Sequence, residues 1–203
     1  MSVQIEPRRV AAEEPNRRAG IVRAAGRLFH QKGYSATTIR DIAGAVGMRS
    51  GSPFYHFKTK NDMLRAVVLE GMGAINAAVA RAANSDKSPR ARFEAMLRAH
   101  LGQLLGGDGR DFAAALLHES RHLEPAVLAE LVAIKDGYEV MWQKVLQDLK
   151  RAGLIADDSQ VARLFLLGAL NWTVQWYRPD GSKSIEQIAR QLASFVLGKP
   201  RRP

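Results

Sequence analysis

The chain has 203 residues, of which 46% are hydrophobic and 25% are charged, a composition typical of a globular protein with ample core material. It contains no cysteine, which excludes disulfide bonds, thiolate metal sites and cysteine nucleophiles. Most of its formal net charge of +10 lies in residues 1–65, where twelve Lys and Arg residues stand against five Asp and Glu residues. Such a local excess favours a polyanionic partner, nucleic acid or an anionic membrane, although it also promotes solubility.

The N-terminal residues are polar and are interrupted by Pro7 and Pro15, so they do not form the apolar core of a signal peptide. No apolar run approaches the roughly 18 residues that a membrane span needs. We therefore expect a cytoplasmic protein with no membrane partner. Residues 1–15 are expected to form a flexible basic arm.

Nearly every later segment has apolar residues at helical spacing, and none alternates over the length of a strand, which predicts an all-α fold. Glycine and proline residues separate nine expected helices, three short and then six longer ones. These helices are expected at about 16–32, 38–46, 50–57, 59–83, 89–105, 111–122, 125–151, 158–177 and 184–197.

Residues 38–57 read TIRDIAGAVGMRSGSPFYHF, which is the pattern of a helix-turn-helix with Gly47 in the turn. Phe54 and Phe57 are expected to be buried by the second helix. Pro53 is tolerated only in a first helical turn, so a helix that begins at Ser52 is very short. The outward positions are Arg49, Ser50, Gly51, Ser52, Tyr55 and His56.

Residues 16–64 as a whole resemble the N-terminal domain of the TetR family of transcriptional regulators. The resemblance is carried by Gly33-Tyr34, Thr37-Thr38, Phe54-Tyr55-His56-Phe57 and Lys60 with Leu64. Pro53 departs from the family pattern, in which a leucine is more usual. The resemblance implies a three-helix DNA-binding domain at 16–62 and a six-helix ligand-binding and dimerisation domain at 63–203.

The resemblance also implies a homodimer that binds a palindromic double-stranded DNA operator. Thr38, Tyr55, His56 and Lys60 are then expected to contact phosphates, whereas Arg49, Ser50 and Ser52 face the bases. Gly51 lets the backbone approach the major groove closely. Two roles are open for Arg49, which can donate two hydrogen bonds to the O6 and N7 atoms of a guanine or bind a phosphate.

The expected helix at 158–177 is apolar nearly all round, so it needs two burial partners. One is the core of its own subunit. A four-helix interface with the helix at 184–197 and their copies in a second subunit supplies the other, unless both faces are buried within one subunit. The residues expected in this interface are Leu166, Leu170, Ile188, Leu192 and Phe195.

The segment LGALNWTVQWYRPDGSKSIEQIARQLASFVLG resembles the C-terminal part of TetR regulators that respond to acyl-CoA thioesters. An acyl-CoA is therefore the first candidate effector, and an apolar drug-like molecule, as for regulators of efflux, is the alternative. Pockets combine an apolar wall with a few polar groups, although ordinary core packing also explains each such residue alone. The candidate pocket residues are Phe93, His100, Arg121, Tyr138, Trp142, Asn171, Trp172 and Arg178.

His118 and His122 belong to a literal H-E-x-x-H motif, which on a helix places two imidazoles one turn apart, as in zinc peptidases. However, Pro125 ends the helix almost at once, and no strand is expected to hold a substrate. We therefore expect no metal, no cofactor and no enzymatic activity, with a zinc-dependent hydrolase as the alternative function.

Overall fold

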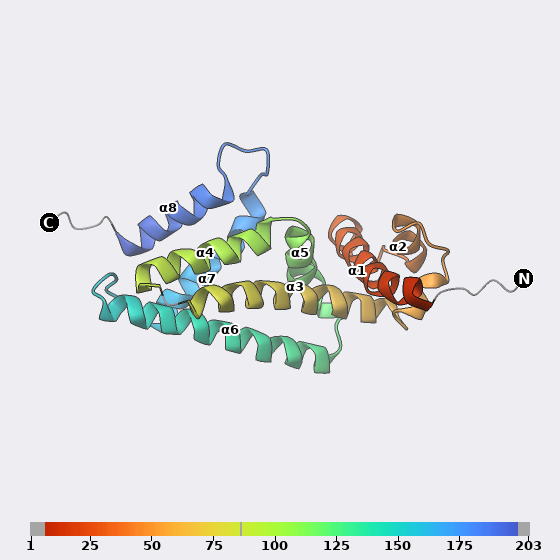
Figure 1. Ribbon diagram of the computed structural model, residues 1–203, viewed down its shortest axis with the longest axis horizontal. Helices are drawn as coiled ribbons and strands as arrows, with labels where there is room; N and C mark the ends of the chain where they lie inside the picture. The colour runs from red at the N-terminus through yellow and green to blue at the C-terminus, as the bar shows by residue number, and fades with distance from the viewer. Residues whose placement is uncertain (1–6, 86, 199–203) are drawn as a thin grey trace, which may run out of the picture.

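The computed structural model describes residues 7–85 and 87–198, which form eight α-helices, two 3₁₀-helices and no strand (Figure 1). This confirms the all-α prediction. The elements are α1 (Pro7–Lys32), α2 (Ile39–Ala45), η1 (Ser52–Tyr55), α3 (Lys60–Ala83), α4 (Pro89–Leu105), α5 (Gly109–Glu119), η2 (Ser120–His122), α6 (Pro125–Arg151), α7 (Gln160–Trp176) and α8 (Ile185–Leu197).

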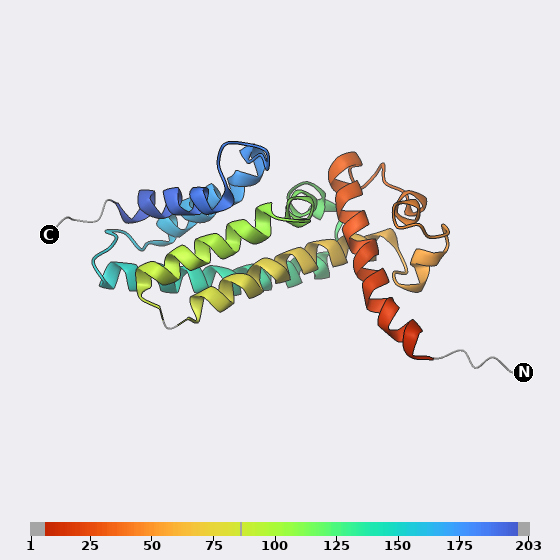
Figure 2. The same cartoon turned by 45° about the horizontal axis from the view of Figure 1, so that its top comes forward.

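Two elements differ from the expected ones. The third helix is a four-residue 3₁₀-helix, η1, rather than an α-helix over 50–57. Helix α1 begins at Pro7, so residues 7–15 are helical where a flexible arm was expected, and α1 projects from the rest of the molecule (Figure 2). The Ala-Ala-Glu-Glu stretch at 11–14 favours a helix, and proline is compatible with a first helical position. Residues 1–6 of the expected arm lie outside the described residues.

Three helices begin with a capping box, in which the first side chain and the residue three positions later bond reciprocally to backbone N–H groups. They are α2 with Thr38 and Asp41, α3 with Thr59 and Asp62, and α8 with Ser184 and Gln187. Each cap stabilises its helix by about 1 kcal/mol, which matters most for the short α2.

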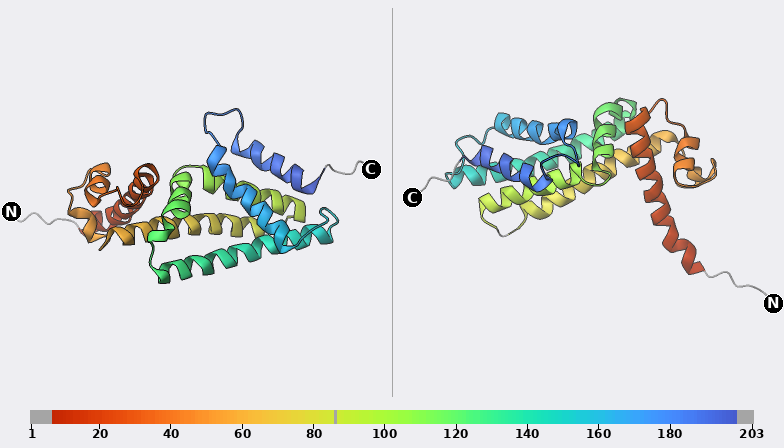
Figure 3. Two further views of the ribbon diagram at one scale, coloured as in Figure 1. Left: turned by 180° about the vertical axis from the view of Figure 1, so that it is seen from behind. Right: turned by 90° about the horizontal axis from the view of Figure 1, so that it is seen from above.

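The apolar side chains form two clusters that α3 joins. One cluster contains Ile21 of α1, Ile42 of α2 and the first half of α3, and the other surrounds Trp142 between α4, α6, α7 and α8. Figures 1 and 3 show α1 and α2 at one end of the molecule and α8 at the other. The first cluster also includes Leu123 and Val127, so the expected boundary between residues 62 and 63 does not separate two independent cores.

Helix α3 is, among the described residues, the one helix long and apolar enough to cross a membrane by length and composition. Its apolar residues have another explanation, because eight of its residues are buried within the protein. A core helix that contacts two clusters is expected to be apolar.

Candidate DNA-binding face and effector cavity

The helix-turn-helix is formed by α2, a turn and η1. Gly47 has a φ of +67°, a backbone conformation that residues with a side chain rarely adopt, and it ends α2 as expected. Pro53 occupies the first turn of η1 and is buried. Phe57 is buried as expected, but Phe54 is half exposed because the tight 3₁₀ turn directs it away from the core.

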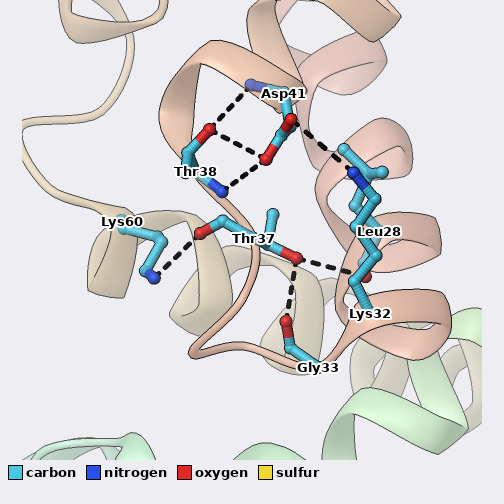
Figure 4. Close-up of polar contacts among 7 residues, drawn as sticks. All are labelled: Leu28, Lys32, Gly33, Thr37, Thr38, Asp41 and Lys60. Atoms are coloured by element: carbon cyan, nitrogen blue, oxygen red, sulfur yellow. Dashed lines mark hydrogen bonds and ion pairs between the residues drawn. The ribbon is translucent and has the colours of Figure 1, made fainter.

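Thr37 and Thr38 position α2 rather than presenting free hydroxyls (Figure 4). The buried Thr37 Oγ1 donates to the carbonyl oxygens of Leu28 and Gly33, at 3.2 and 2.8 Å. Thr38 Oγ1 donates to Asp41 Oδ2 at 2.8 Å and accepts from the Asp41 N–H at 3.1 Å. The hydrogen bond from the Thr38 N–H contributes most to holding the pKa of Asp41 below its usual value. Thr38 thus caps α2, and its expected phosphate contact stays a prediction.

Lys60, whose expected phosphate contact stays a prediction, makes hydrogen bonds inside the domain. Its Nζ donates to the carbonyl oxygen of Thr37 at 2.9 Å (Figure 4). It also donates to the carbonyl oxygen of Tyr34 at 2.9 Å and lies 4.3 Å from the centre of the Tyr34 ring. Two of the three ammonium protons are therefore used inside the domain. Lys60 ties the start of α3 to the loop before α2.

The exposed surface of the turn and η1 contains the other expected DNA contacts. Tyr55 is 90% exposed, Arg49, Ser50 and Gly51 are also exposed, and Ser52 and His56 are half-buried. Arg40 and Lys58 were not expected at the site, yet they are exposed beside it. The side chains of Arg40, Arg49 and Lys58 make no ion pair or hydrogen bond with a described residue, so this surface is positively charged. The excess of basic residues in 1–65 was the sequence signal that could have indicated Arg40 and Lys58.

A cavity of about 700 Å³ lies between α3, α4, α5, α6 and α7, a size typical of small-molecule sites. Its wall is mainly apolar. Of the eight expected pocket residues, His100, Tyr138 and Asn171 line it. Three charged residues, Asp108, Lys135 and Glu139, also line it and were not expected.

The other five expected pocket residues do not line the cavity. Phe93 and Trp142 are fully buried and pack edge to face, with their ring centres 6.2 Å apart. Arg121 and Arg178 are exposed, and Trp172 is 66% exposed. A helical period alone does not distinguish the cavity side of a helix from the core or from a surface that a partner covers.

A buried histidine and a buried tyrosine form a hydrogen-bonded pair at the cavity wall. His100 Nδ1 and the Tyr138 hydroxyl form a hydrogen bond, and the Trp142 ring lies 6.2 Å from the Tyr138 ring. Burial raises the pKa of Tyr138. Burial lowers the pKa of His100 to about 4, an effect that the Asn171 side chain opposes. His100 is therefore neutral at pH 7.

The lowered pKa of His100 predicts an acid-sensitive fold. In the unfolded chain this histidine takes up a proton near pH 6.5, whereas in the folded protein it does so only near pH 4. Stability is therefore lost as the pH falls through this window, by about 2 kcal/mol between pH 8 and pH 5. We expect His100→Gln to reduce this difference, measured by urea unfolding at both pH values. An equal pH dependence in the variant would contradict the assignment.

Helices α7 and α8 lie in the part of the molecule remote from α1 and α2 (Figure 3). Both helices have large apolar side chains that are exposed. Phe195 is 85% exposed, Phe165 is 77% exposed, and Trp172 and Trp176 are also exposed. Of the expected interface residues, Leu166, Leu170 and Ile188 are instead buried in their own core, and Leu192 is partly buried. We call the exposed residues Phe165, Trp172, Trp176 and Phe195 the α7–α8 face.

Helix α5 connects the cavity with the DNA-binding end. Phe112 lines the cavity and packs where Gly26 of α1 and Gly71 of α3 leave room. A Cβ atom at Gly71 would lie 2.7 Å from the Phe112 Cβ. In addition, His30 Nδ1 lies 2.7 Å from Asp111 Oδ1. Helix α3, which contributes to both apolar clusters, therefore has a second connection between the cavity and the DNA-binding end beside it.

The H-E-x-x-H residues lie at this same junction. Helix α5 ends at Glu119, and His122 stacks on the Tyr34 ring with a centroid distance of 4.8 Å. His122 Nε2 lies 3.5 Å from Glu119 Oε2, and the Asn61 amide donates to the His122 carbonyl at 2.6 Å. Within residues 7–85 and 87–198, no group of three or more His, Asp or Glu side chains is arranged to hold a metal ion. The contacts of His122 join η2 to the DNA-binding end.

A helix-turn-helix at one end and an apolar cavity behind it define a ligand-binding regulator of the helix-turn-helix class. Residues 21–67 match the family described as bacterial regulatory proteins, tetR family, and residues 86–199 match the tetracyclin repressor-like C-terminal domain. The chain belongs to the TetR family, as its resemblance predicted.

Individual relatives agree with this assignment. The chain is 30% identical to the HTH-type transcriptional repressor KstR2 of Rhodococcus jostii strain RHA1, over 89% of each chain. The crystal structure of AibR with isovaleryl coenzyme A and operator DNA has a TM-score of 0.78 and 26% identity, covering 89% of this chain and 98% of that chain. The crystal structure of the superantigen PfiT has a TM-score of 0.73 and 38% identity, covering 90% and 97%.

Proposed function

We propose that the protein is a cytoplasmic, homodimeric transcriptional repressor that binds a palindromic operator and is released from it by a small-molecule effector. The observation that carries this proposal is the cavity of about 700 Å³, joined by α3 and α5 to an exposed, positively charged helix-turn-helix. The two exposed regions supply what a dimeric repressor needs, a DNA-binding face and an apolar α7–α8 face.

An acyl-CoA thioester is the first candidate effector. AibR, which has this fold, was crystallised with isovaleryl coenzyme A and operator DNA, and the mainly apolar cavity suits an acyl chain. The alternative is an apolar drug-like or aromatic molecule. The test is to select an operator from random DNA and titrate the complex with short, long and aromatic acyl-CoAs and with the corresponding free acids. If no acyl-CoA changes the operator affinity while an unrelated apolar compound does, the effector class is wrong.

For DNA binding, we expect two substitutions in the exposed surface to have different effects. Tyr55→Phe removes one hydroxyl and should weaken binding to all sequences similarly, because phosphate contacts do not specify bases. Arg49→Ala should relax the preference at one base pair and cost about 1–3 kcal/mol there. Quantitative binding to the selected operator and to single-base variants measures both effects.

The matched control is Arg81→Ala, which removes an exposed arginine from the last turn of α3, in the half of that helix remote from the helix-turn-helix. It changes the net charge as much as Arg49→Ala does, so it should leave the base preference intact. Unaltered operator binding by both test variants would refute this DNA-binding face.

A further inference from the structure

The His100 imidazole is an unusual feature of the cavity wall. It is only 2% exposed, yet it lines the cavity, and its Nε2 atom makes no hydrogen bond with a described residue. An unsatisfied buried polar atom costs free energy, so its retention calls for a reason. Asn171, exposed on α7 and also lining the cavity, is near enough to favour the protonated imidazole.

The neighbours of His100 determine which of its nitrogens has the proton. Among the described residues, the Tyr138 hydroxyl has one hydrogen-bond partner, His100 Nδ1. The proton of this buried hydroxyl has no other acceptor among those residues, so Tyr138 donates to His100 Nδ1. The single proton of the neutral imidazole is then on Nε2. His100 therefore has one N–H available at the cavity wall.

The charged residues of the wall are already paired. Lys135 Nζ lies 3.1 Å from Glu139 Oε1, and Glu139 Oε2 accepts from Arg163 at 2.8 Å. Asp108 Oδ2 lies 3.9 Å from Arg23 Nε. Among the described residues, the cavity wall thus has no unpaired cation for a carboxylate, and its neutral side-chain donors include His100, Asn171 and Gln103. His100 is the buried one of these three.

We propose that the effector presents an uncharged carbonyl oxygen, of a ketone, ester or thioester, which accepts hydrogen bonds from His100 Nε2 and the Asn171 amide. The hydrogen bond between Tyr138 and His100 Nδ1 orients the imidazole for this contact, and the apolar wall holds the rest of the molecule. A free carboxylate of the same length binds more weakly because its charge would be buried without a partner. This proposal rests on the proposed function, whose effector it defines chemically.

The test uses 2-undecanone, undecanoate and undecane as probes, with calorimetric titration of the full-length protein. We expect 2-undecanone to bind at least about tenfold more tightly than either of the others. His100→Phe, which keeps an aromatic ring but has no N–H, should abolish this preference, and His100→Gln, which has an N–H, should restore part of it. Asn171→Leu tests the second donor at an exposed position that folding tolerates, with Gln175→Leu, one turn further along α7, as its control.

The proposal is overturned if undecanoate or undecane binds as tightly as the ketone, if no probe binds, or if Asn171→Leu and the folded His100 variants keep the full preference. Operator binding by the same samples separates this result from the proposed function. A protein that binds its operator and responds to another ligand without preferring the ketone refutes only the carbonyl contact. A protein that prefers the ketone but binds no operator refutes the repressor function instead.

Discussion

Glutamates in place of Phe165 and Phe195 should convert the protein to monomers and lower its operator affinity by at least about 100-fold. The two rings are 77% and 85% exposed on the α7–α8 face, and this apolar surface is proposed to be covered by a second copy. Two linked helix-turn-helix units bind a palindrome with an avidity that a single unit lacks, typically a gain of about 10²–10⁴-fold. Sedimentation gives the mass, and operator titration gives the affinity.

The matched control places glutamates at Val132 and Val140, two exposed valines of α6 that are outside the α7–α8 face. This variant adds the same charge and removes a similar exposed apolar area, so it should remain dimeric and keep its operator affinity. Helical circular dichroism establishes that both proteins are folded. A dimer of unchanged mass for the Phe165 and Phe195 variant would show that α7 and α8 do not form the interface.

Loss of the Phe112 ring should separate effector binding from DNA release. In the intact protein we expect a saturating effector to lower operator affinity about 5–150-fold, the range of ordinary allosteric coupling. Phe112 touches the cavity and packs against the sites of Gly26 and Gly71, so an effector that displaces it also displaces α1 and α3. With Phe112→Leu the effector should still bind, while its effect on operator affinity falls toward one-fold.

The measurement is a set of four affinities for each protein, namely DNA with and without effector and effector with and without DNA. By linkage the two ratios must agree, which checks the data internally. Leu117→Ala, which also changes a cavity residue of α5, is the control and should alter effector affinity but not the coupling. Full coupling in Phe112→Leu would mean that α3 alone transmits the effector signal.

Local sequence patterns were enough to predict most of the helices and the position of the helix-turn-helix, although not the start of α1 or the 3₁₀ form of η1. Gly47 has the positive φ that the turn needs, and the capping box of Thr59 and Asp62 starts α3 within one residue of the expected beginning of that helix. These features depend on residues a few positions apart, so a sequence contains them directly. The shortness of η1 was also predictable from the sequence, because Pro53 limits where a helical turn can begin.

Tertiary structure decided which side of each helix meets the core, the cavity or the surface. Leu166 and Phe165 are neighbours in the sequence, yet the first is buried in its own subunit and the second is exposed. Trp142 and Trp172 have similar chemistry, but one lies in the core and the other on the α7–α8 face. Lys60 is held by carbonyl groups more than twenty residues away, which no local pattern reveals. Apolar periodicity predicts that a side chain is shielded from water, whereas the packing of distant helices decides what shields it.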